Sequence, residues 1–216
     1  MIYIKIPVGM LQCNCSILGD PITREAIVID PGDEVGRILD LLGRHKLTVK
    51  AIISTHAHID HVGGLSKLRQ YTGAPVMIHR DDLQLYEGLD VQAAFLGMRE
   101  PEMAEIDQLL KEGDPLRWGC YEARVIHTPG HTPGSVCLYM PKDDANITIP
   151  VPQLFAGDTL FAGSIGRTDL WGGSLEKIIE SLTGKLMELP EETIVYPGHG
   201  PTTTIGQERH NNPFLI

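Results

Sequence analysis

Apolar residues along this chain fall into two patterns. Short β-branched runs are typical of buried strands, and longer stretches with apolar residues three or four positions apart are typical of amphipathic helices. The runs that predict strands are residues 1–7, 13–18, 26–29, 50–54, 75–79, 123–126, 135–140, 153–156 and 193–196. Helical spacing is found over residues 35–42, 61–71, 174–187 and 206–212. The first of these helices is expected to end at Gly43. This β-α-β-α order predicts an α/β protein whose sheet faces are covered by helices.

The middle of the chain, residues 80–114, has an irregular helical pattern and no strand signal. It fits either a lid or insert over a site, or a plain pair of surface helices. The KDDAN segment at 142–146 is expected to form a polar hairpin tip. No repeat, linker or low-complexity segment interrupts the 216 residues, so we expect one domain spanning 1–216.

Charge and composition narrow the range of partners. The formal net charge is −10 and no basic run is present, which argues against nucleic acid as a partner. The first ten residues lack the features of a signal peptide, and no apolar run approaches the roughly 20 residues of a membrane span. We therefore expect a cytoplasmic protein that acts on a small molecule, and the sequence leaves its oligomeric state open.

The four cysteines do not suggest a metal clamp or a disulfide. Cys13 and Cys15 are one residue apart, and Cys120 and Cys137 have no local partner. We interpret all four as small buried hydrophobic residues.

One short segment concentrates metal-ligating side chains. His56 and His58 directly follow a predicted strand and can point the same way, whereas Asp60 and His61 follow where a helix begins. Imidazole and carboxylate together suit zinc, iron or manganese better than calcium. The segment therefore predicts a transition-metal site.

Three further candidate ligands follow predicted strands. His131, Asp158 and His199 each have a glycine directly before them, which lets the backbone turn sharply beside the ligand. Loops at strand ends are where sites collect in layered α/β proteins. The remaining histidines lack this context, and we interpret them as structural: His45, His79, His127 and His210.

Four motifs together resemble those of the metallo-β-lactamase superfamily: THAHIDHVGG, HTPGHTPGS, AGDTLF and YPGHG. The segment AGDTLFAGSIGRTD and the terminal NNPFL are similar to the glyoxalase II group of hydroxyacylglutathione hydrolases, in its short prokaryote-type form. The resemblance implies a four-layer αβ/βα sandwich. It also implies a metal-bridging hydroxide that cleaves a thioester such as an S-2-hydroxyacylglutathione.

The resemblance also implies a division of the ligands between two divalent ions, with zinc as the first choice and iron and manganese as alternatives. The first ion would be held by His56, His58 and His131. The second would be held by Asp60, His61 and His199, and Asp158 would bridge the two. Asp60 would also act in catalysis, by orienting the hydroxide or accepting its proton.

Arg167 is the candidate substrate-binding residue, because its guanidinium can hold a substrate carboxylate through two hydrogen bonds. It can equally form a structural ion pair with Asp169. The alternatives to thioester hydrolysis are a mononuclear iron persulfide dioxygenase and a lactonase of the same fold. The acidic net charge disfavours a phosphodiesterase, and an enzyme is favoured over a metal store.

Overall fold

The computed structural model describes residues 1–142 and 149–216. The expected hairpin tip at 142–146 lies largely outside the described residues. The chain divides into two compact units. One comprises Met1–Leu110 with Arg117–Tyr121, and the other comprises Lys111–Leu116 with Glu122–Ile216. No helix in the described part of the chain combines the length and apolarity that a bilayer crossing requires.

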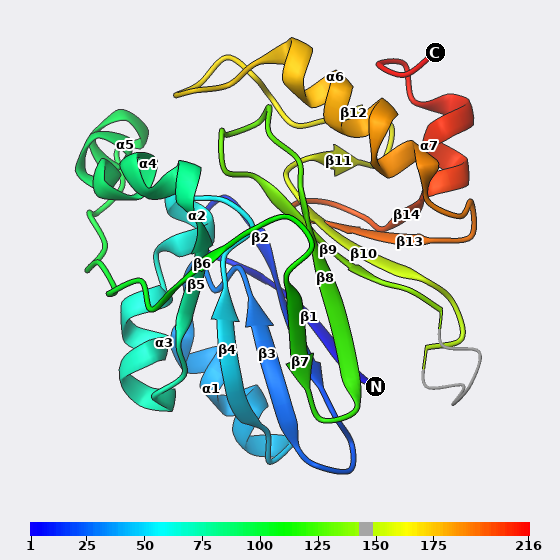
Figure 1. Ribbon diagram of the computed structural model, residues 1–216. Helices are drawn as coiled ribbons and strands as arrows, with labels where there is room; N and C mark the ends of the chain where they lie inside the picture. Colours follow the sequence, from blue (N-terminus) through cyan, green and yellow to red (C-terminus); the bar gives the residue numbers. More distant parts are fainter. Residues whose placement is uncertain (143–148) are drawn as a thin grey trace. The chain divides into compact units, whose positions relative to one another are not determined.

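The first unit is built on a six-stranded sheet of order β1-β2-β3-β4-β5-β6, antiparallel from β1 to β3 and parallel from β3 to β6 (Figure 1). Its strands are β1 (Ile2–Val8), β2 (Cys13–Gly19), β3 (Glu25–Ile29), β4 (Thr48–Ile53), β5 (Val76–His79) and β6 (Gln108–Leu110). Its helices are α1 (Val35–Arg44), α2 (Ile59–Val62), α3 (Leu65–Thr72), the 3-10 helix η1 (Arg80–Asp82), α4 (Leu83–Glu87) and α5 (Leu89–Leu96).

Helices α1 and α3 pack on one face of this sheet (Figure 1). The core there joins alternate strand residues such as Val28 and Ile52 to Ile38 of α1 and Leu68 of α3, all fully buried. The apolar side chains on this face of the strands, every second residue, pack against the apolar sides of the two helices. Because β3, β4 and β5 are parallel, their carboxyl ends lie at the same edge of the sheet, where loops can gather functional residues.

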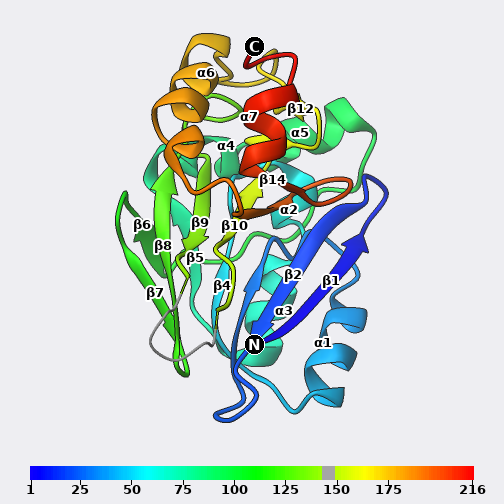
Figure 2. The ribbon, with the colours of Figure 1, turned by 90° about the vertical axis from the view of Figure 1, so that its right-hand side faces the viewer.

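The other six-stranded sheet has the order β14-β13-β10-β9-β8-β7 and belongs to the second unit, except for the residues of β7 and β8 that fall within Arg117–Tyr121. Its strands are β7 (Pro115–Trp118), β8 (Tyr121–His127), β9 (Val136–Met140), β10 (Gln153–Gly157), β13 (Ile194–Pro197) and β14 (Thr203–Thr204), and a small separate hairpin is formed by β11 (Leu160–Phe161) and β12 (Ser164–Ile165). Its helices are α6 (Leu175–Gly184), the 3-10 helix η2 (Leu186–Glu188) and α7 (Ile205–Asn211). Helices α6 and α7 lie near each other in Figure 2, and both contribute to one core with β10 and β13. The two helices are capped by Ser174 and Thr204, whose hydroxyls accept N–H groups of the first turn.

Two helix boundaries differ from the prediction. Helix α1 continues through Gly43 to Arg44. Just past its end, Lys46 adopts the left-handed φ of 53°, and Leu47 N donates to Leu42 O at 2.9 Å. The helix expected over 61–71 is split into α2 and α3 at Gly63 and Gly64. A Cβ on either of these glycines would collide with backbone oxygens of the 31–32 turn, so close approach of two backbones explains both.

The middle segment also differs from its prediction. It contains η1, α4 and α5 as expected, but it also contributes the edge strand β6, which pairs in parallel with β5. Strand β7 was not predicted either. Both strands have four residues or fewer, too short for an alternating pattern to become visible in the sequence.

Asp20 ties together two distant parts of the first unit. Its buried carboxylate accepts N–H groups from Ile22 at 2.6 Å, Thr23 at 3.1 Å and Cys120 at 2.8 Å. Burial acts to raise the pKa of Asp20, but these hydrogen bonds outweigh it and lower the pKa from 3.8 to about 2. The ionised carboxylate therefore stabilises the folded state.

Asp20→Asn is expected to destabilise the protein by about 1–3 kcal/mol near neutral pH, because the amide removes one acceptor and places a donor against N–H groups. The pKa of Asp20 is lower in the folded state, so its contribution is complete above pH 4 and disappears as the pH falls toward 2. Denaturant unfolding at pH 7 and at low pH measures this difference. The exposed Asp40→Asn serves as the control, and equal losses for both variants at pH 7 would contradict the assignment.

Candidate metal centre

The first unit presents four of the expected ligands on one short loop after β4. The ring centroids of His56 and His58 are 4.8 Å apart, and those of His56 and His61 are 4.0 Å apart. The Oδ2 atom of Asp60 lies 3.7 Å from Nε2 of His61. The three imidazoles are buried, and the Asp60 side chain is 13% exposed. The four side chains therefore cluster as the sequence predicted.

Asp30, which the sequence analysis did not single out, orients one of these ligands. Its Oδ2 lies 3.1 Å from Nδ1 of His61, and the same carboxylate accepts the hydroxyl and backbone N–H of Thr55, each at 2.7 Å. An ionised carboxylate only accepts, so Nδ1 of His61 donates and Nε2 keeps its lone pair for a metal. Asp30 adopts φ 51°, a costly conformation for a residue other than glycine, and such outliers cluster at functional sites. The Asp-Pro-Gly turn after a strand was the available signal for this residue.

The backbone of the ligand loop is held by buried polar side chains from the middle segment. Asp82 accepts the N–H of Ala57 at 2.9 Å. Gln92 accepts the N–H of Ile59 at 3.0 Å and donates to the carbonyl of Ala57 at 3.1 Å. Both Asp82 and Gln92 are essentially fully buried. Residues 80–114, which were expected to form a lid or surface helices, therefore hold the backbone of the ligand loop.

The second unit brings together the other three expected ligands around one carboxylate. Oδ2 of Asp158 lies 3.7 Å from Nε2 of His131 and 3.6 Å from Nε2 of His199. Metal–ligand bonds of about 2.1 Å at tetrahedral angles place ligand atoms about 3.4 Å apart. The Asp158 oxygen therefore stands at a separation from each of the two imidazoles that suits metal ligation.

Strand ends and a glycine explain this arrangement. Strands β10 and β13 are parallel, so Asp158 and His199 follow the same edge of the sheet. His131 is oriented by a 2.8 Å hydrogen bond between its Nδ1 and the backbone carbonyl of Arg167, which leaves Nε2 directed toward Asp158. A Cβ at Gly166 would collide with the Asp158 carbonyl, so only glycine permits this approach.

The Arg167 side chain forms a bidentate ion pair with Asp169. Its Nε and Nη2 donate to the two carboxylate oxygens at 2.7 and 2.9 Å. Hydrogen bonding to Arg167 lowers the pKa of Asp169 to about 2. Both side chains are more than half exposed, so this pair contributes little to stability. The structural alternative for Arg167 is thus realised in the ion pair, and its role toward substrate stays a prediction.

The other four histidines and the four cysteines differ in exposure. His45 and His210 are exposed, and Nε2 of His127 lies 2.9 Å from the carbonyl of Pro133. All four cysteines are free thiols. Three are buried as expected, but Cys120 is exposed, because it lies at the tip of the hairpin between β7 and β8. The expectation of burial was therefore wrong for Cys120.

Imidazole nitrogens and carboxylate oxygens make up both ligand clusters, a donor set that fits divalent transition metals. The donor types alone do not distinguish zinc, iron and manganese.

Comparisons with known proteins agree with this reading. Residues 8–199 match the family model of the metallo-beta-lactamase superfamily. A relative in Haemophilus influenzae, hydroxyacylglutathione hydrolase GloC, is 37% identical over 97% of this chain and 96% of its own length. The crystal structure of the BLEG-1 B3 metallo-beta-lactamase is similar with a TM-score of 0.88 at 40% identity, and 99% of each chain is covered. The structure of TTHA1623 in a di-iron-bound form is similar with a TM-score of 0.85 at 40% identity, over 98% of this chain and 100% of that one.

These matches confirm the α/β class and the fold that the motifs implied. With its His/Asp donor set and a family match over most of its length, the chain belongs to the metallo-beta-lactamase superfamily.

Proposed function

We propose that this metal-dependent hydrolase cleaves a thioester such as an S-2-hydroxyacylglutathione. The observation that carries the proposal is the Asp158 carboxylate set between the Nε2 atoms of His131 and His199. The similarity to hydroxyacylglutathione hydrolase GloC supports the substrate class.

We assign the ligands as the family pattern divides them. In this proposal His56, His58 and His131 hold one divalent ion, Asp60, His61 and His199 hold a second, and Asp158 serves both. Two such ions, when bound, acidify water to a pKa near 7 and stabilise charge on an acyl oxygen. Zinc is the first choice, and the di-iron form of TTHA1623 supports iron as the alternative.

The protein's own groups complete the chemistry. Asp60 is partly exposed and offers an anionic oxygen beside His61, so we assign it to orient the attacking water or to accept its proton. Asp30 and the Arg167 carbonyl hold His61 and His131 in one tautomer, which keeps both Nε2 atoms unprotonated. The four free thiols favour a reducing compartment, so the proposal places the protein in the cytoplasm.

The function is tested with the full chain loaded with zinc, iron or manganese. We expect thiol release from S-lactoylglutathione, loss of this activity on chelation, recovery on adding metal back, and close to two ions per chain by elemental analysis. Parallel assays measure oxygen uptake with glutathione persulfide, opening of a lactone, and hydrolysis of a β-lactam, the last because of the likeness to BLEG-1. Oxygen uptake without thiol release, or no thioester turnover by any loaded form, would overturn the proposal.

A further inference from the structure

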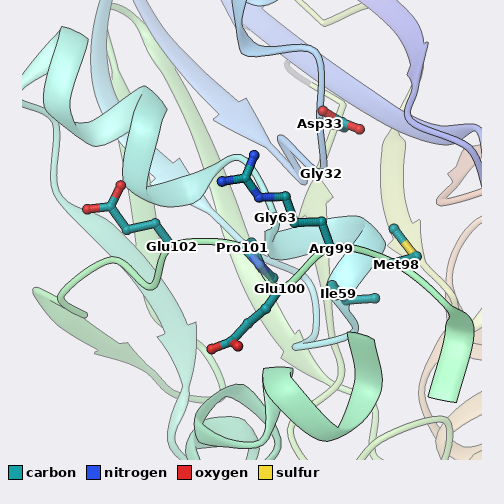
Figure 3. A pocket seen from close by; sticks show the side chains of 9 residues that line it. All are labelled: Gly32, Asp33, Ile59, Gly63, Met98, Arg99, Glu100, Pro101 and Glu102. Carbon is teal, nitrogen blue, oxygen red and sulfur yellow. The ribbon is translucent and has the colours of Figure 1, made fainter. Parts of the chain in front are cut away.

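A pocket of about 330 Å³ opens in the first unit beside the metal-ligand loop (Figure 3). Three segments line it: the turn at Gly32 and Asp33, the short helix α2 through Ile59 and Gly63, and the segment after α5 that begins at Met98. Its volume lies at the lower end of small-molecule sites, which suits one end of a ligand rather than a whole one.

The pocket adjoins the metal ligands through the chain itself. Ile59 stands between His58 and Asp60, and a Cβ at Gly32 would collide with the Asp60 carbonyl. The floor of the pocket is therefore continuous with the loop that carries four of the candidate ligands. A group bound here therefore lies against the backbone of that loop.

The chain that continues from the pocket-lining residues is held in place although it has no regular secondary structure. The hydroxyl of Tyr86 accepts the N–H of Ala104 at 2.7 Å and lies 3.2 Å from its carbonyl. Asp107 accepts the Val76 N–H at 2.8 Å and pairs with Arg69 at 2.8 Å. These bonds anchor Ala104 and Asp107, just past the pocket-lining residues.

Arg99 is the one cationic side chain among the residues that line the pocket. In the part of the chain that the structure describes, no hydrogen bond or ion pair engages its guanidinium. Of the neighbouring acids, Glu102 accepts from Gln70, and Glu100 extends from the segment in the opposite direction to Arg99 (Figure 3). The guanidinium is thus available to an anionic ligand group, in contrast to that of Arg167, which Asp169 occupies.

We propose that this pocket binds the amino-acid end of the thiol half of the substrate, with the carboxylate on Arg99 and the ammonium group near Asp33. This inference rests on the proposed thioester hydrolysis. A guanidinium binds a carboxylate through two parallel hydrogen bonds, which gives orientation as well as affinity. Asp33, also on the pocket wall, supplies the opposite charge that an α-amino acid group requires.

Kinetics with two substrates test the proposal. We expect Arg99→Met to lower kcat/KM roughly tenfold to a hundredfold for S-lactoylglutathione, mostly through KM, and to leave a lactoyl thioester of neutral N-acetylcysteamine unaffected. Arg99→Lys should recover part of the loss. Arg44→Met, which replaces an exposed arginine at the end of α1, is the matched control and should change neither substrate.

The same comparison decides between the two arginines. If Arg167 holds the substrate carboxylate, Arg167→Met will produce the selective loss and Arg99→Met will not, which overturns the proposal. If Arg167 only pairs with Asp169, its removal will affect both substrates alike. Equal losses on both substrates for Arg99→Met would also overturn the assignment of the pocket.

A binding measurement separates this inference from the proposed function. Calorimetry with glutathione and the metal-loaded protein requires no turnover. We expect wild-type protein to bind glutathione roughly tenfold or more tightly than Arg99→Met, and Asp33→Asn also to bind it more weakly. Equal affinity in wild type and Arg99→Met excludes the pocket, whereas selective binding without thioester cleavage would refute the proposed reaction and retain the site.

Discussion

Asp158→Asn is expected to leave the chain folded, to reduce the bound metal from about two ions to one or fewer, and to lower kcat/KM by at least about a hundredfold. Asparagine keeps the size of the side chain but removes the negative charge. Its amide can also turn a donor toward the Nε2 atoms of His131 and His199, which now lie 3.7 and 3.6 Å from a carboxylate oxygen. Elemental analysis and steady-state kinetics on the same preparation measure both effects.

Two controls accompany this variant. Glu180→Gln removes a carboxylate from the exposed side of α6 in the same unit and should change neither quantity. His199→Ala removes one neighbour of Asp158 and should weaken only one of the two ions. Unchanged metal content together with unchanged turnover in Asp158→Asn would refute the central role given to this residue.

The clustering of the candidate ligands could be predicted from the sequence because their signal is local. His56, His58, Asp60 and His61 lie within six residues, and the structure places their side chains together on one loop. Strand-end positions beside glycine also singled out His131, Asp158 and His199 as candidates, because a buried β-branched run followed by a turn can be recognised without knowing its partners. The layered α/β class followed from the same alternation of runs.

The residues that position these ligands could not be found in this way. Asp82 and Gln92 are separated from the backbone groups they hold by 25 and 33–35 residues, and the helical pattern of the middle segment gives no sign that they are buried. A polar residue in an irregular helix is normally exposed. Arg99 was not singled out either, because only the fold brings it to the pocket beside Ile59.

The second large effect is expected for Gln92→Met, which tests directly whether Gln92 positions the ligand loop. Methionine matches glutamine in length, so the cavity stays filled. The change leaves the N–H of Ile59 without its acceptor, and the carbonyls of Ala57 and Leu85 without their 3.1 and 2.9 Å donor. Each buried group that loses its partner costs about 1–3 kcal/mol. We therefore expect a lower melting temperature for the metal-free protein and a metal Kd roughly ten- to a hundredfold higher, the size typical of lost support behind a ligand.

The metal affinity distinguishes positioning from stability alone. A residue that only stabilises the fold would lower the melting temperature, but the folded variant would bind metal as before. If Gln92 positions the loop, the visible spectrum of the cobalt-substituted protein should also change, because His58 and Asp60 flank the Ile59 peptide that Gln92 holds. Gln84→Met makes the same substitution at an exposed position of α4 and should alter neither the spectrum nor the Kd. An unchanged spectrum and Kd in folded Gln92→Met would show that Gln92 only stabilises the fold. The conformation of the ligand loop would then depend on Asp30, Asp82 and its own short helix.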